Sequence, residues 1–340
     1  MVGVGYWGPN LLRNFSEIPD CKIRAVCDSN SSRLQAVAKK YPGVMTSNSI
    51  DAVIANPDID AIVIATPANT HFDVAIKCLN AGKHVFVEKP LALNAQHCEE
   101  LIAIAAQKRL CLMVGHTFLY NAAVSYVKKL IHDGSLGDVL YVYCQRLNLG
   151  KIRDDLDVVW NLAPHDISIL CYWFDSLPST IRAKGYSYLQ QGLADVAFIT
   201  MDFPHMVGAN IHVSWLDPNK TRVITVVGTK KMVVYDDVAL DHKIMIFDKG
   251  VQNPETIHAR LMAVGNTFDD FRIELRDGDI TIPHLKVPEP LREECERFVR
   301  YVAKNETPPS DGKNGLDVVR VLQACSLSMM SDGSAQAIVP

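Results

Sequence analysis

The residue best suited to acid–base chemistry is Lys89, which stands in the segment Glu88-Lys89-Pro90. It follows the apolar run His84–Val87, and the proline after it predicts that the amine lies at the end of a buried strand. When a hydride leaves a carbinol carbon, the hydroxyl proton must also leave, and a buried amine can accept it. Burial near a cation lowers the pKa of lysine from about 10.4. We expect Glu88 to orient Lys89 or a cofactor; a surface lysine in a loop is the alternative interpretation.

A second set of groups suited to proton chemistry lies in the segment Trp160-Asn161-Leu162-Ala163-Pro164-His165-Asp166. The pKa of a free histidine, about 6.5, suits a proton shuttle, although a lone histidine is usually structural. Asn161 and His165 are four residues apart, so they share one helical face if the helix begins before Pro164. We expect Asp166 to cap this helix; fixing the tautomer of His165 is the alternative.

A glycine-rich turn near the start of the chain has the pattern of a dinucleotide-binding loop, Gly3-x-Gly5-x-x-Gly8. In such loops the first glycine permits a tight turn, the second admits the pyrophosphate, and the third lets helix pack on strand. Tyr6 and Trp7, inside the turn, are expected to border the cofactor. A helix over Pro9–Ser16 directs its amino-terminal N–H groups at the phosphates. The alternative is a tight turn that binds nothing.

Asp28 directly follows the apolar run Ala25-Val26-Cys27. A carboxylate at this place accepts hydrogen bonds from the ribose hydroxyls and repels a 2′-phosphate, which favours NAD over NADP. Ser29 and Arg33 are suited to hold a phosphate, so NADP is the alternative cofactor. Asp28 can also cap the following helix, a role compatible with ribose binding.

From residue 1 to about 116, β-branched runs alternate with segments of helical period, which predicts a doubly wound parallel sheet. We expect strands at Met1–Val4, Ile23–Cys27, Ala61–Ala65, His84–Val87 and Leu110–Val114. We expect helices at Pro9–Ser16, Ser31–Lys40, Ser49–Ala55, Thr70–Ala81 and Ala95–Gln107. The first strand is short, with four residues before Gly5, where a central strand has about six. A late start site or a trimmed chain would explain this.

After residue 117 the strand patterns follow one another, which predicts a largely antiparallel open sheet. The expected strands are Asp138–Leu147, Ile181–Tyr188, Asp195–Phe203, Gly208–Trp215, Arg222–Val227, Lys231–Asp236 and Lys243–Phe247. The expected helices are Phe118–Asp133, Ala163–Phe174, Pro290–Lys304 and Gly315–Met330. The sequence therefore predicts an α/β protein of two domains, a Rossmann domain over residues 1–116 and a substrate-binding and oligomerisation domain over residues 117–340.

Composition narrows the class of protein. The chain has 340 residues, of which 48% are hydrophobic and 21% charged, with a net charge of −4, which is ordinary for a globular protein and argues against binding nucleic acid or a membrane surface. No apolar run reaches the about eighteen residues of a membrane span, and the turn after Met1 leaves no room for a signal peptide. The nine cysteines lack C-x-x-C spacing, which favours reduced thiols in a cytoplasm over disulfides or a metal site.

In this order, the glycine turn, Glu88-Lys89-Pro90 and Asn161–Asp166 resemble the Gfo/Idh/MocA family of NAD(P)-dependent sugar oxidoreductases over nearly the whole chain. Gly5-Tyr6-Trp7-Gly8-Pro9-Asn10 and Trp160–Asp166 are most similar to its nucleotide-sugar 3-dehydrogenases. The resemblance implies that Lys89 and His165 work together around the reactive hydroxyl, with substrate in a cleft between the domains. It also implies a homo-oligomer, a dimer or tetramer, formed through the open sheet. One position departs, because the family usually has Asp where this chain has Asn161.

The resemblance extends to further binding residues. The family's T-P-x-x-x-H segment borders the cofactor, which assigns that role to Thr66, Pro67, Asn69 and His71. His71 could equally cap or pack near a helix start. Tyr120 and Arg146 lie on the segments leading to the second domain and are candidates for sugar binding, with Arg146 suited to a phosphate or carboxylate. Both could instead brace the sheet.

The expected function is NAD-linked oxidation of a secondary alcohol of a sugar, or the reverse ketone reduction. A nucleotide-linked amino sugar such as UDP-N-acetylglucosamine, oxidised at C3, is the leading substrate by resemblance alone, because fold does not fix function. One alternative is a dehydrogenase of a free sugar, an inositol or a keto-sugar. The other is a non-catalytic sensor of dinucleotide and sugar, which Asn161 favours and which Lys89 and His165 oppose.

Overall fold

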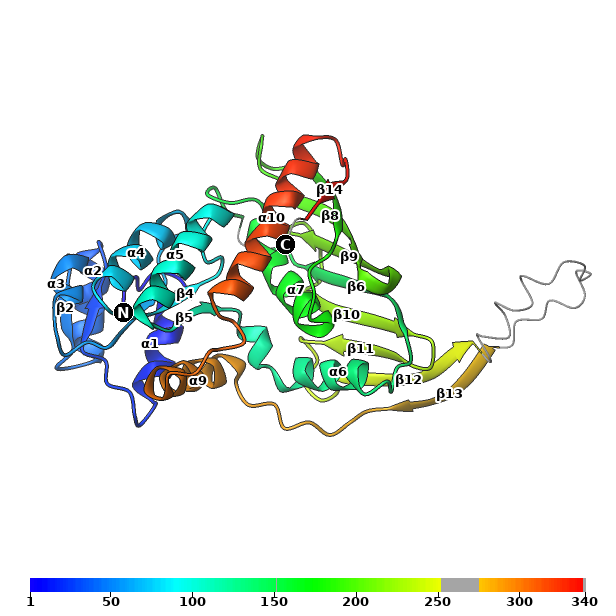
Figure 1. The fold of residues 1–340 in the computed structure, drawn as a ribbon, viewed down its shortest axis with the longest axis horizontal. Coiled ribbons are helices and arrows are strands. Elements are labelled where there is room, and N and C mark those ends of the chain that lie inside the picture. Colours follow the sequence, from blue (N-terminus) through cyan, green and yellow to red (C-terminus); the bar gives the residue numbers. More distant parts are fainter. Residues whose placement is uncertain (151, 252–274, 339–340) are drawn as a thin grey trace, which may run out of the picture. The chain divides into compact units, whose positions relative to one another are not determined.

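The computed structural model describes residues 1–150, 152–251 and 275–338. The chain forms two compact units (Figure 1): the first contains Met1–Asn121 and Val287–Gln323, the second Ala122–Lys286 and Ala324–Val339. The chain thus returns to the first unit after residue 286, which the predicted division between residues 116 and 117 did not include. Most of the second unit, Ala122–Lys286, is thus inserted in sequence into the first, and its remaining residues, Ala324–Val339, follow the second segment of the first unit.

The first unit is built on parallel strands, as the alternating sequence pattern predicts. Strand β3 (Ala61–Ile64) pairs with β4 (His84–Glu88), and β4 pairs with β5 (Leu112–Gly115). Strand β1 (Ala25–Cys27) pairs in the same way with β2 (Met45–Ser47). Strand β2 was not predicted, because three residues with exposed side chains carry no alternating pattern.

Val2 connects these two groups of strands. It forms parallel bridges with Cys27 of β1 and Ile64 of β3, so the predicted strand Met1–Val4 is reduced to a bridge at one residue. The helices of this unit lie close to their predicted positions: α1 (Gly8–Ser16), α2 (Ser31–Lys40), α3 (Ile50–Ile54), α4 (His71–Asn80) and α5 (Ala95–Lys108). The carboxyl ends of β3, β4 and β5 therefore lie along one edge of the sheet, followed in each case by a candidate functional segment.

Two helices from the end of the chain complete the first unit. Helix α9 (Pro290–Lys304) packs on α1 and on the short helix η2 (Thr117–Tyr120), and α10 (Gly312–Met330) begins in this unit. Three buried rings join them to the sheet: Phe298 lies edge-on to Phe15 and to Phe86, with ring centroids 6.1 and 5.6 Å away. Such edge-to-face contacts stabilise a core beyond the area that they bury.

In the described part of the second unit, nine strands form one sheet in the order β13-β12-β11-β10-β6-β9-β8-β7-β14. All neighbours are antiparallel except β6 and β9, so the prediction of a largely antiparallel sheet is confirmed. Its strands are β6 (Val139–Leu147), β7 (Thr180–Tyr186), β8 (Val196–Phe203), β9 (Val207–Ser214), β10 (Thr221–Gly228), β11 (Met232–Asp236), β12 (Ile244–Val251), β13 (Leu275–Thr281) and β14 (Gln336–Ala337). The polar β13 and the two-residue β14 were not predicted.

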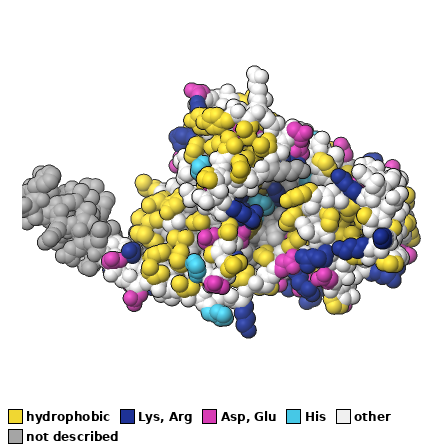
Figure 2. Space-filling model, turned by 180° about the vertical axis from the view of Figure 1, so that it is seen from behind, with side chains coloured by type: hydrophobic (Ala, Val, Ile, Leu, Met, Phe, Trp, Pro, Cys, Tyr) yellow, Lys and Arg dark blue, Asp and Glu magenta, His cyan; other side chains and the backbone are white. Residues whose placement is uncertain are grey.

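Among the residues that the structure describes, helices pack on one face of this sheet and not on the other. Helices α6 (Ala122–His132) and α7 (Val158–Phe174) pack on strands β6, β8, β9 and β11, and Figure 1 shows both on the same side. Buried and exposed side chains alternate along β8, as expected for a sheet with one covered face. Figure 2 shows hydrophobic side chains on the side of the molecule seen from behind. Exposed apolar residues of β6 and β8 are Leu140, Tyr141, Tyr143 and Phe198.

Candidate active site

The glycine turn leaves no room for larger residues at its ends. Gly3 has φ +87°, and a Cβ atom there would lie 2.7 Å from the carbonyl carbon of Ala65. A Cβ atom at Gly8 would lie 2.3 Å from the carbonyl oxygen of Gly3, so helix α1 packs directly against the turn. At Gly5 the nearest atom is the Arg33 guanidinium at 3.6 Å, so the protein itself leaves space on that side. A tight turn, an open middle glycine and the amino end of α1 together fit a dinucleotide pyrophosphate.

Asp28 fixes this turn to the end of β1. Its Oδ2 atom accepts a hydrogen bond of 2.8 Å from the Val4 N–H, and its Oδ1 atom accepts one of 2.8 Å from the Asn30 N–H. The guanidinium of Arg33 lies 3.6 Å from Oδ1 and is half exposed, and Ser29 is exposed beside it. Asn30, not Asp28, caps α2. The carboxylate and a cation thus both lie where the ribose of a dinucleotide binds, which fits NAD and keeps Arg33 as a candidate phosphate ligand.

His71 connects two of the strand-end segments. Its Nδ1 atom lies 2.7 Å from the carbonyl oxygen of Pro90, and its Nε2 atom lies 2.9 Å from that of Thr66. The ring is 1% exposed, and burial lowers the pKa of His71 while the two carbonyl contacts oppose this effect. This geometry favours the packing role for His71. Pro67 and Asn69, in contrast, are exposed at the same edge.

Lys89 follows directly after the last residue of β4, which ends one residue later than predicted. The preceding Glu88 accepts a hydrogen bond of 3.2 Å from the Lys89 N–H through Oε2. The Glu88 carboxyl group lies against Gly115 at the end of β5, where a Cβ atom would be 3.1 Å from Oε2. Burial raises the pKa of Glu88 to about 7, while the charge of Lys89 lowers it. The structure thus holds Lys89 at the ligand-binding edge of a parallel sheet, next to a carboxyl group that titrates near neutrality.

Asn161 and His165 lie on one helix of the second unit. Helix α7 begins at Val158, because Asp157 caps it by accepting a hydrogen bond of 2.9 Å from the Trp160 N–H. Pro164 lies inside the helix, so the predicted start at Ala163 was five residues late. Spaced by four residues, Asn161 and His165 share one helical face. The indole N–H of Trp215 donates to Asn161 Oδ1 at 3.3 Å, a contact that no sequence motif indicated.

Asp166 does not cap a helix, and this prediction was wrong. It lies within α7 and is paired with Arg146 of β6 through two hydrogen bonds, of 3.0 Å from Nε and 2.7 Å from Nη2. Both side chains are almost fully buried. A buried, bidentate guanidinium–carboxylate pair is a strong structural link, which favours the bracing role for Arg146 over contact with a substrate.

Tyr120 is also buried within its own unit. Its hydroxyl group lies 2.8 Å from Ser310 Oγ, and its side chain is 7% exposed. Burial raises the pKa of Tyr120 well above its usual value, so the phenol stays neutral. This contact links η2 to the segment that precedes α10, which again favours the bracing role.

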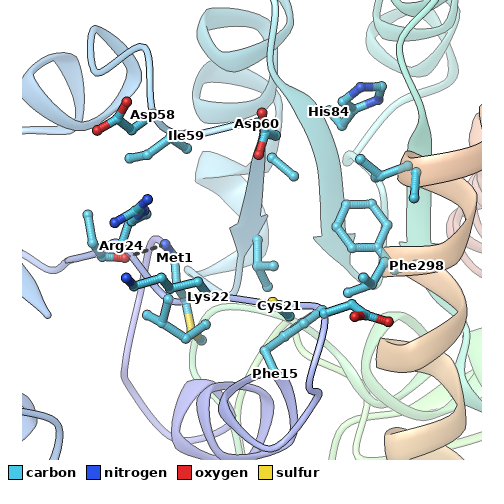
Figure 3. Close-up of a pocket in the computed structure, with 18 residues that line it drawn as sticks. Met1, Phe15, Cys21, Lys22, Arg24, Asp58, Ile59, Asp60, His84 and Phe298 are labelled. Carbon is cyan, nitrogen blue, oxygen red and sulfur yellow. Dashed lines mark hydrogen bonds between the residues drawn. The ribbon is translucent and has the colours of Figure 1, made fainter.

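A cavity lies elsewhere in the first unit (Figure 3). Its volume is about 540 Å³, and the residues that line it include Met1, Arg24, Asp60, His84 and Phe298. The Met1 amine donates a hydrogen bond of 2.8 Å to the Ala25 carbonyl oxygen. Arg24, Asp60 and His84 mark the amino ends of β1, β3 and β4. The cavity is therefore at the edge of the sheet opposite to Lys89 and the glycine turn.

Comparison with known proteins identifies the family. Residues 1–116 match the family described as "Oxidoreductase family, NAD-binding Rossmann fold", and residues 124–234 match the "GFO/IDH/MocA C-terminal domain". The chain therefore belongs to the Gfo/Idh/MocA oxidoreductase family, and its first unit contains an NAD-binding Rossmann domain. Within the part of the chain that the structure describes, no helix is long and apolar enough to cross a membrane.

Individual relatives are more distant. An uncharacterized oxidoreductase of Streptococcus pneumoniae is 28% identical over 60% of this chain and 58% of its own length. UDP-N-acetylglucosamine 3-dehydrogenase of Acidithiobacillus ferrooxidans is 30% identical over 63% of this chain and 66% of its own length. The chain thus spans less than two thirds of these relatives. A solved structure of the Acidithiobacillus ferrooxidans enzyme, GnnA, has a TM-score of 0.77 at 24% identity over 97% of this chain and 96% of its own, which shows a shared fold.

Proposed function

We propose that this protein is an NAD-dependent oxidoreductase that transfers a hydride between nicotinamide and a secondary alcohol or ketone of a sugar. The observation that carries the proposal is the carboxyl edge of the parallel sheet in the first unit. There the glycine turn and Asp28 suit a dinucleotide, and Lys89 follows β4 beside a buried carboxyl group. Ligands of open α/β sheets bind outside this edge.

The proposed chemistry gives each side chain one task. Bound NAD supplies the hydride acceptor. Lys89 takes the hydroxyl proton as the carbon–hydrogen bond breaks, and His165 acts on the same hydroxyl group as a second proton-transfer residue. The Asn161 amide donates or accepts a hydrogen bond to the sugar, while the Trp215 contact holds its oxygen in place. Thr66, Pro67 and Asn69 border the cofactor.

For the substrate we propose a nucleotide-linked amino sugar oxidised at C3. The support is the relative of Acidithiobacillus ferrooxidans, which is a UDP-N-acetylglucosamine 3-dehydrogenase and is 30% identical over 63% of this chain. A free sugar or an inositol is the competing substrate class, since the residues of the first unit suit any secondary alcohol. Discrimination of such substrates depends on side chains that hydrogen-bond their polar groups.

A dehydrogenase assay tests both proposals. Purified protein is incubated with NAD or NADP and with UDP-sugars, the corresponding free sugars and inositols, and the absorbance of reduced nicotinamide is followed. We expect reduction of NAD with a UDP-amino sugar and a lower rate with NADP. Turnover of free sugars or inositol alone would contradict the substrate proposal and leave the oxidoreductase proposal standing.

A non-catalytic regulator is the second candidate function, and Asn161 is the observation that favours it. An amide can neither take a proton nor hold a nearby cation by charge, unlike the Asp usual in the family. Calorimetry together with the dehydrogenase assay separates the two functions. A regulator binds dinucleotide and sugar in the calorimeter but reduces NAD with no substrate in the assay.

We further propose that the open face of the second unit's sheet forms the contact between copies of this chain in a dimer or tetramer. Leu140, Tyr141, Tyr143 and Phe198 expose between 39% and 49% of their surface on this face. Exposed aromatic and aliphatic side chains gathered on one surface are typical of an interface. Light scattering should show an oligomer for the native protein and a smaller species for Tyr141→Glu with Phe198→Glu.

A reducing cytoplasm is the compartment that we propose. All nine cysteines are free, and eight of them are buried. A thiol count after denaturation of protein purified without reductant should find every cysteine reduced.

A further inference from the structure

Helix α9 carries one carboxyl group on its buried face. Glu294 is fully buried, and it lies on the same helical stripe as Leu291, Cys295 and Phe298. The neighbouring acidic residues point away from the core and form surface pairs, Glu293 with Arg297 and Glu296 with Arg292. A glutamate is almost never fully buried without a partner, so Glu294 requires an explanation.

Glu294 lies near the end of β5, close to Glu88. Its Oε2 atom accepts a hydrogen bond of 2.7 Å from the Thr117 hydroxyl, and its buried Oε1 atom has no hydrogen-bond partner. Thr117 is two residues after Gly115, against which the Glu88 carboxyl group lies. Glu88 Oε1 is likewise buried and without a hydrogen-bond partner. Two buried carboxyl groups, each with one unsatisfied oxygen, therefore lie at this strand end.

In the part of the chain that the structure describes, the one positive charge that faces the Glu88–Glu294 pair is that of Lys89, so two carboxyl groups share one cation. Among the described residues, the titratable groups that face Glu294 are Glu88, Tyr120 and Cys295. Glu88 faces Lys89 as well. Burial and the charge of Glu88 raise the pKa of Glu294 well above its usual value. Two like charges so close in a dry interior cannot both be ionised cheaply, so one proton stays with the pair.

The lysine has two further titratable neighbours in the first unit. His71 and His116 both face Lys89. Burial lowers the pKa of His116 to about 4, and its Nδ1 atom lies 2.6 Å from Asn314 Oδ1. Both rings are therefore neutral near pH 7 and leave the carboxyl pair as the source of charge that responds to pH there.

We propose that Glu294 is a positioning residue for Lys89: it keeps its proton while Glu88 is ionised, so that the buried pair presents one negative charge to the lysine. The proposal rests on the proposed function in that Lys89 accepts the substrate proton. A single charge stabilises the ammonium ion that forms during oxidation. A second charge would hold the proton on Lys89 too tightly and raise the pH at which the neutral amine becomes available.

The first experiment measures the proton directly and does not depend on turnover. Infrared spectra of protein with ¹³C-labelled glutamate are recorded from pH 5 to about 9, the range over which a buried carboxyl group titrates. We expect a protonated-carboxyl band well above neutral pH, where Glu88 is ionised, and we expect this band to be absent in Glu294→Gln. The control Glu296→Gln, on the exposed side of α9, should retain the band. No such band in the native protein, or the same band in Glu294→Gln, would overturn the proposal.

Thr117→Val provides a second variant in case Glu294→Gln does not fold. The Thr117 hydroxyl group lowers the pKa of Glu294, because its hydrogen bond favours the carboxylate. Its removal should therefore extend the protonated-carboxyl band to higher pH. A band that disappears at lower pH than in the native protein would contradict the assignment to Glu294.

The second experiment separates positioning from simple structural support. The rate of NAD reduction rises with pH as Lys89 becomes neutral. In Glu294→Gln this rise should stay near its native pH, because the neutral amide carries the same charge as a protonated carboxyl group. In Glu88→Gln, which removes the negative charge that faces Lys89, the rise should move to lower pH by about half a unit or more. The control Glu296→Gln should keep the native pH profile. A rise moved to lower pH in Glu294→Gln would show that Glu294 is ionised while Lys89 titrates, and an unmoved rise in Glu88→Gln would show that the pair does not act on Lys89; either result would overturn the proposal. If no substrate is turned over, the proposed function fails, while the infrared result still decides the state of the pair.

Discussion

The two units hold their candidate functional groups by different means. In the first unit, main-chain atoms position these groups. Glycines shape the turn, the N–H groups of Val4 and Asn30 donate hydrogen bonds to Asp28, and the Lys89 N–H donates one to Glu88. In the second unit, side chains on α7 and its neighbours do so, through the Arg146–Asp166 pair and the Trp215–Asn161 contact. A site built on main-chain atoms tolerates changes in side-chain type, except where a new Cβ atom would collide. A site built on side chains changes with each substitution.

The largest effect should come from breaking the buried pair of the second unit. Arg146→Met leaves the Asp166 charge without its partner, which costs about 3–5 kcal/mol of the free energy of unfolding. Arg182→Met is the control, because the Arg182–Asp202 pair is half exposed and contributes about 0–1 kcal/mol. Denaturant unfolding measures both. A stable Arg146→Met protein that loses only sugar affinity would show that Arg146 binds substrate.

In the glycine turn, a substitution at Gly8 should destabilise the fold, whereas one at Gly5 should leave the fold intact. A Cβ atom at Gly8 would lie 2.3 Å from a carbonyl oxygen, so Gly8→Ala should destabilise the first unit by about 3 kcal/mol. Gly5→Ala meets only the Arg33 side chain at 3.6 Å and should unfold like the native protein. Its added methyl group instead obstructs the pyrophosphate and should weaken NAD binding about tenfold or more. Unchanged NAD affinity in Gly5→Ala would contradict the proposed position of the cofactor.

Lys89→Ala tests the chemistry at the strand end. The fold and the glycine turn should persist, because the lysine's own main-chain contact with Glu88 does not need its side chain. We expect turnover to fall by at least ~10²-fold, the usual scale for a positioned acid–base group, with NAD affinity changed by no more than a few-fold. Stopped-flow reduction and NAD titration measure the two quantities. Near-native turnover would exclude Lys89 as the proton acceptor.

Asn161→Asp should have the smallest effect on stability and rate, and it tests most directly how the side chains of the second unit contribute. The carboxylate can still accept the Trp215 hydrogen bond, so the free energy of unfolding should change little. If Asn161 belongs to the proposed reacting groups, the new charge favours the protonated forms of Lys89 and His165, which raises their pKa and moves the rise of rate with pH to higher pH. Asn161→Ala is the uncharged control. Activity that appears only in Asn161→Asp would support the regulator, and an unchanged profile would place Asn161 outside the reacting groups.

The main-chain features were the ones that sequence patterns could predict. The run His84–Val87 followed by Glu88-Lys89-Pro90 located β4 and Lys89 to within a residue, because a buried parallel strand reads as a continuous apolar run. The position of Asp28 at a strand end could be predicted for the same reason, since it directly follows the apolar run of β1.

Side-chain contacts between distant segments could not be predicted. The start of α7 was missed because Pro164 suits a first turn, while the cap at Asp157 has no motif around it. The pairing of Asp166 with Arg146 and of Asn161 with Trp215 depends on strand register, which one sequence does not contain. The sequence did indicate that Glu294 is unusual, because it interrupts the apolar stripe of α9. Its proximity to Glu88, however, depends on how that helix packs.

The division of the first unit into two pieces of sequence has a consequence for synthesis. A ribosome completes Met1–Asn121 long before it reaches Val287–Gln323. Until then the nascent Rossmann segment lacks α9, so Phe15 and Phe86 miss the Phe298 ring and Thr117 misses Glu294. Residues Ala122–Lys286 of the second unit emerge before α9, but that unit also needs Ala324–Val339, whose strand β14 pairs with β7. Both units therefore reach their final core only when nearly the whole chain has emerged. A fragment ending at residue 121 should therefore aggregate or require a chaperone, even though it contains the complete glycine turn and Lys89.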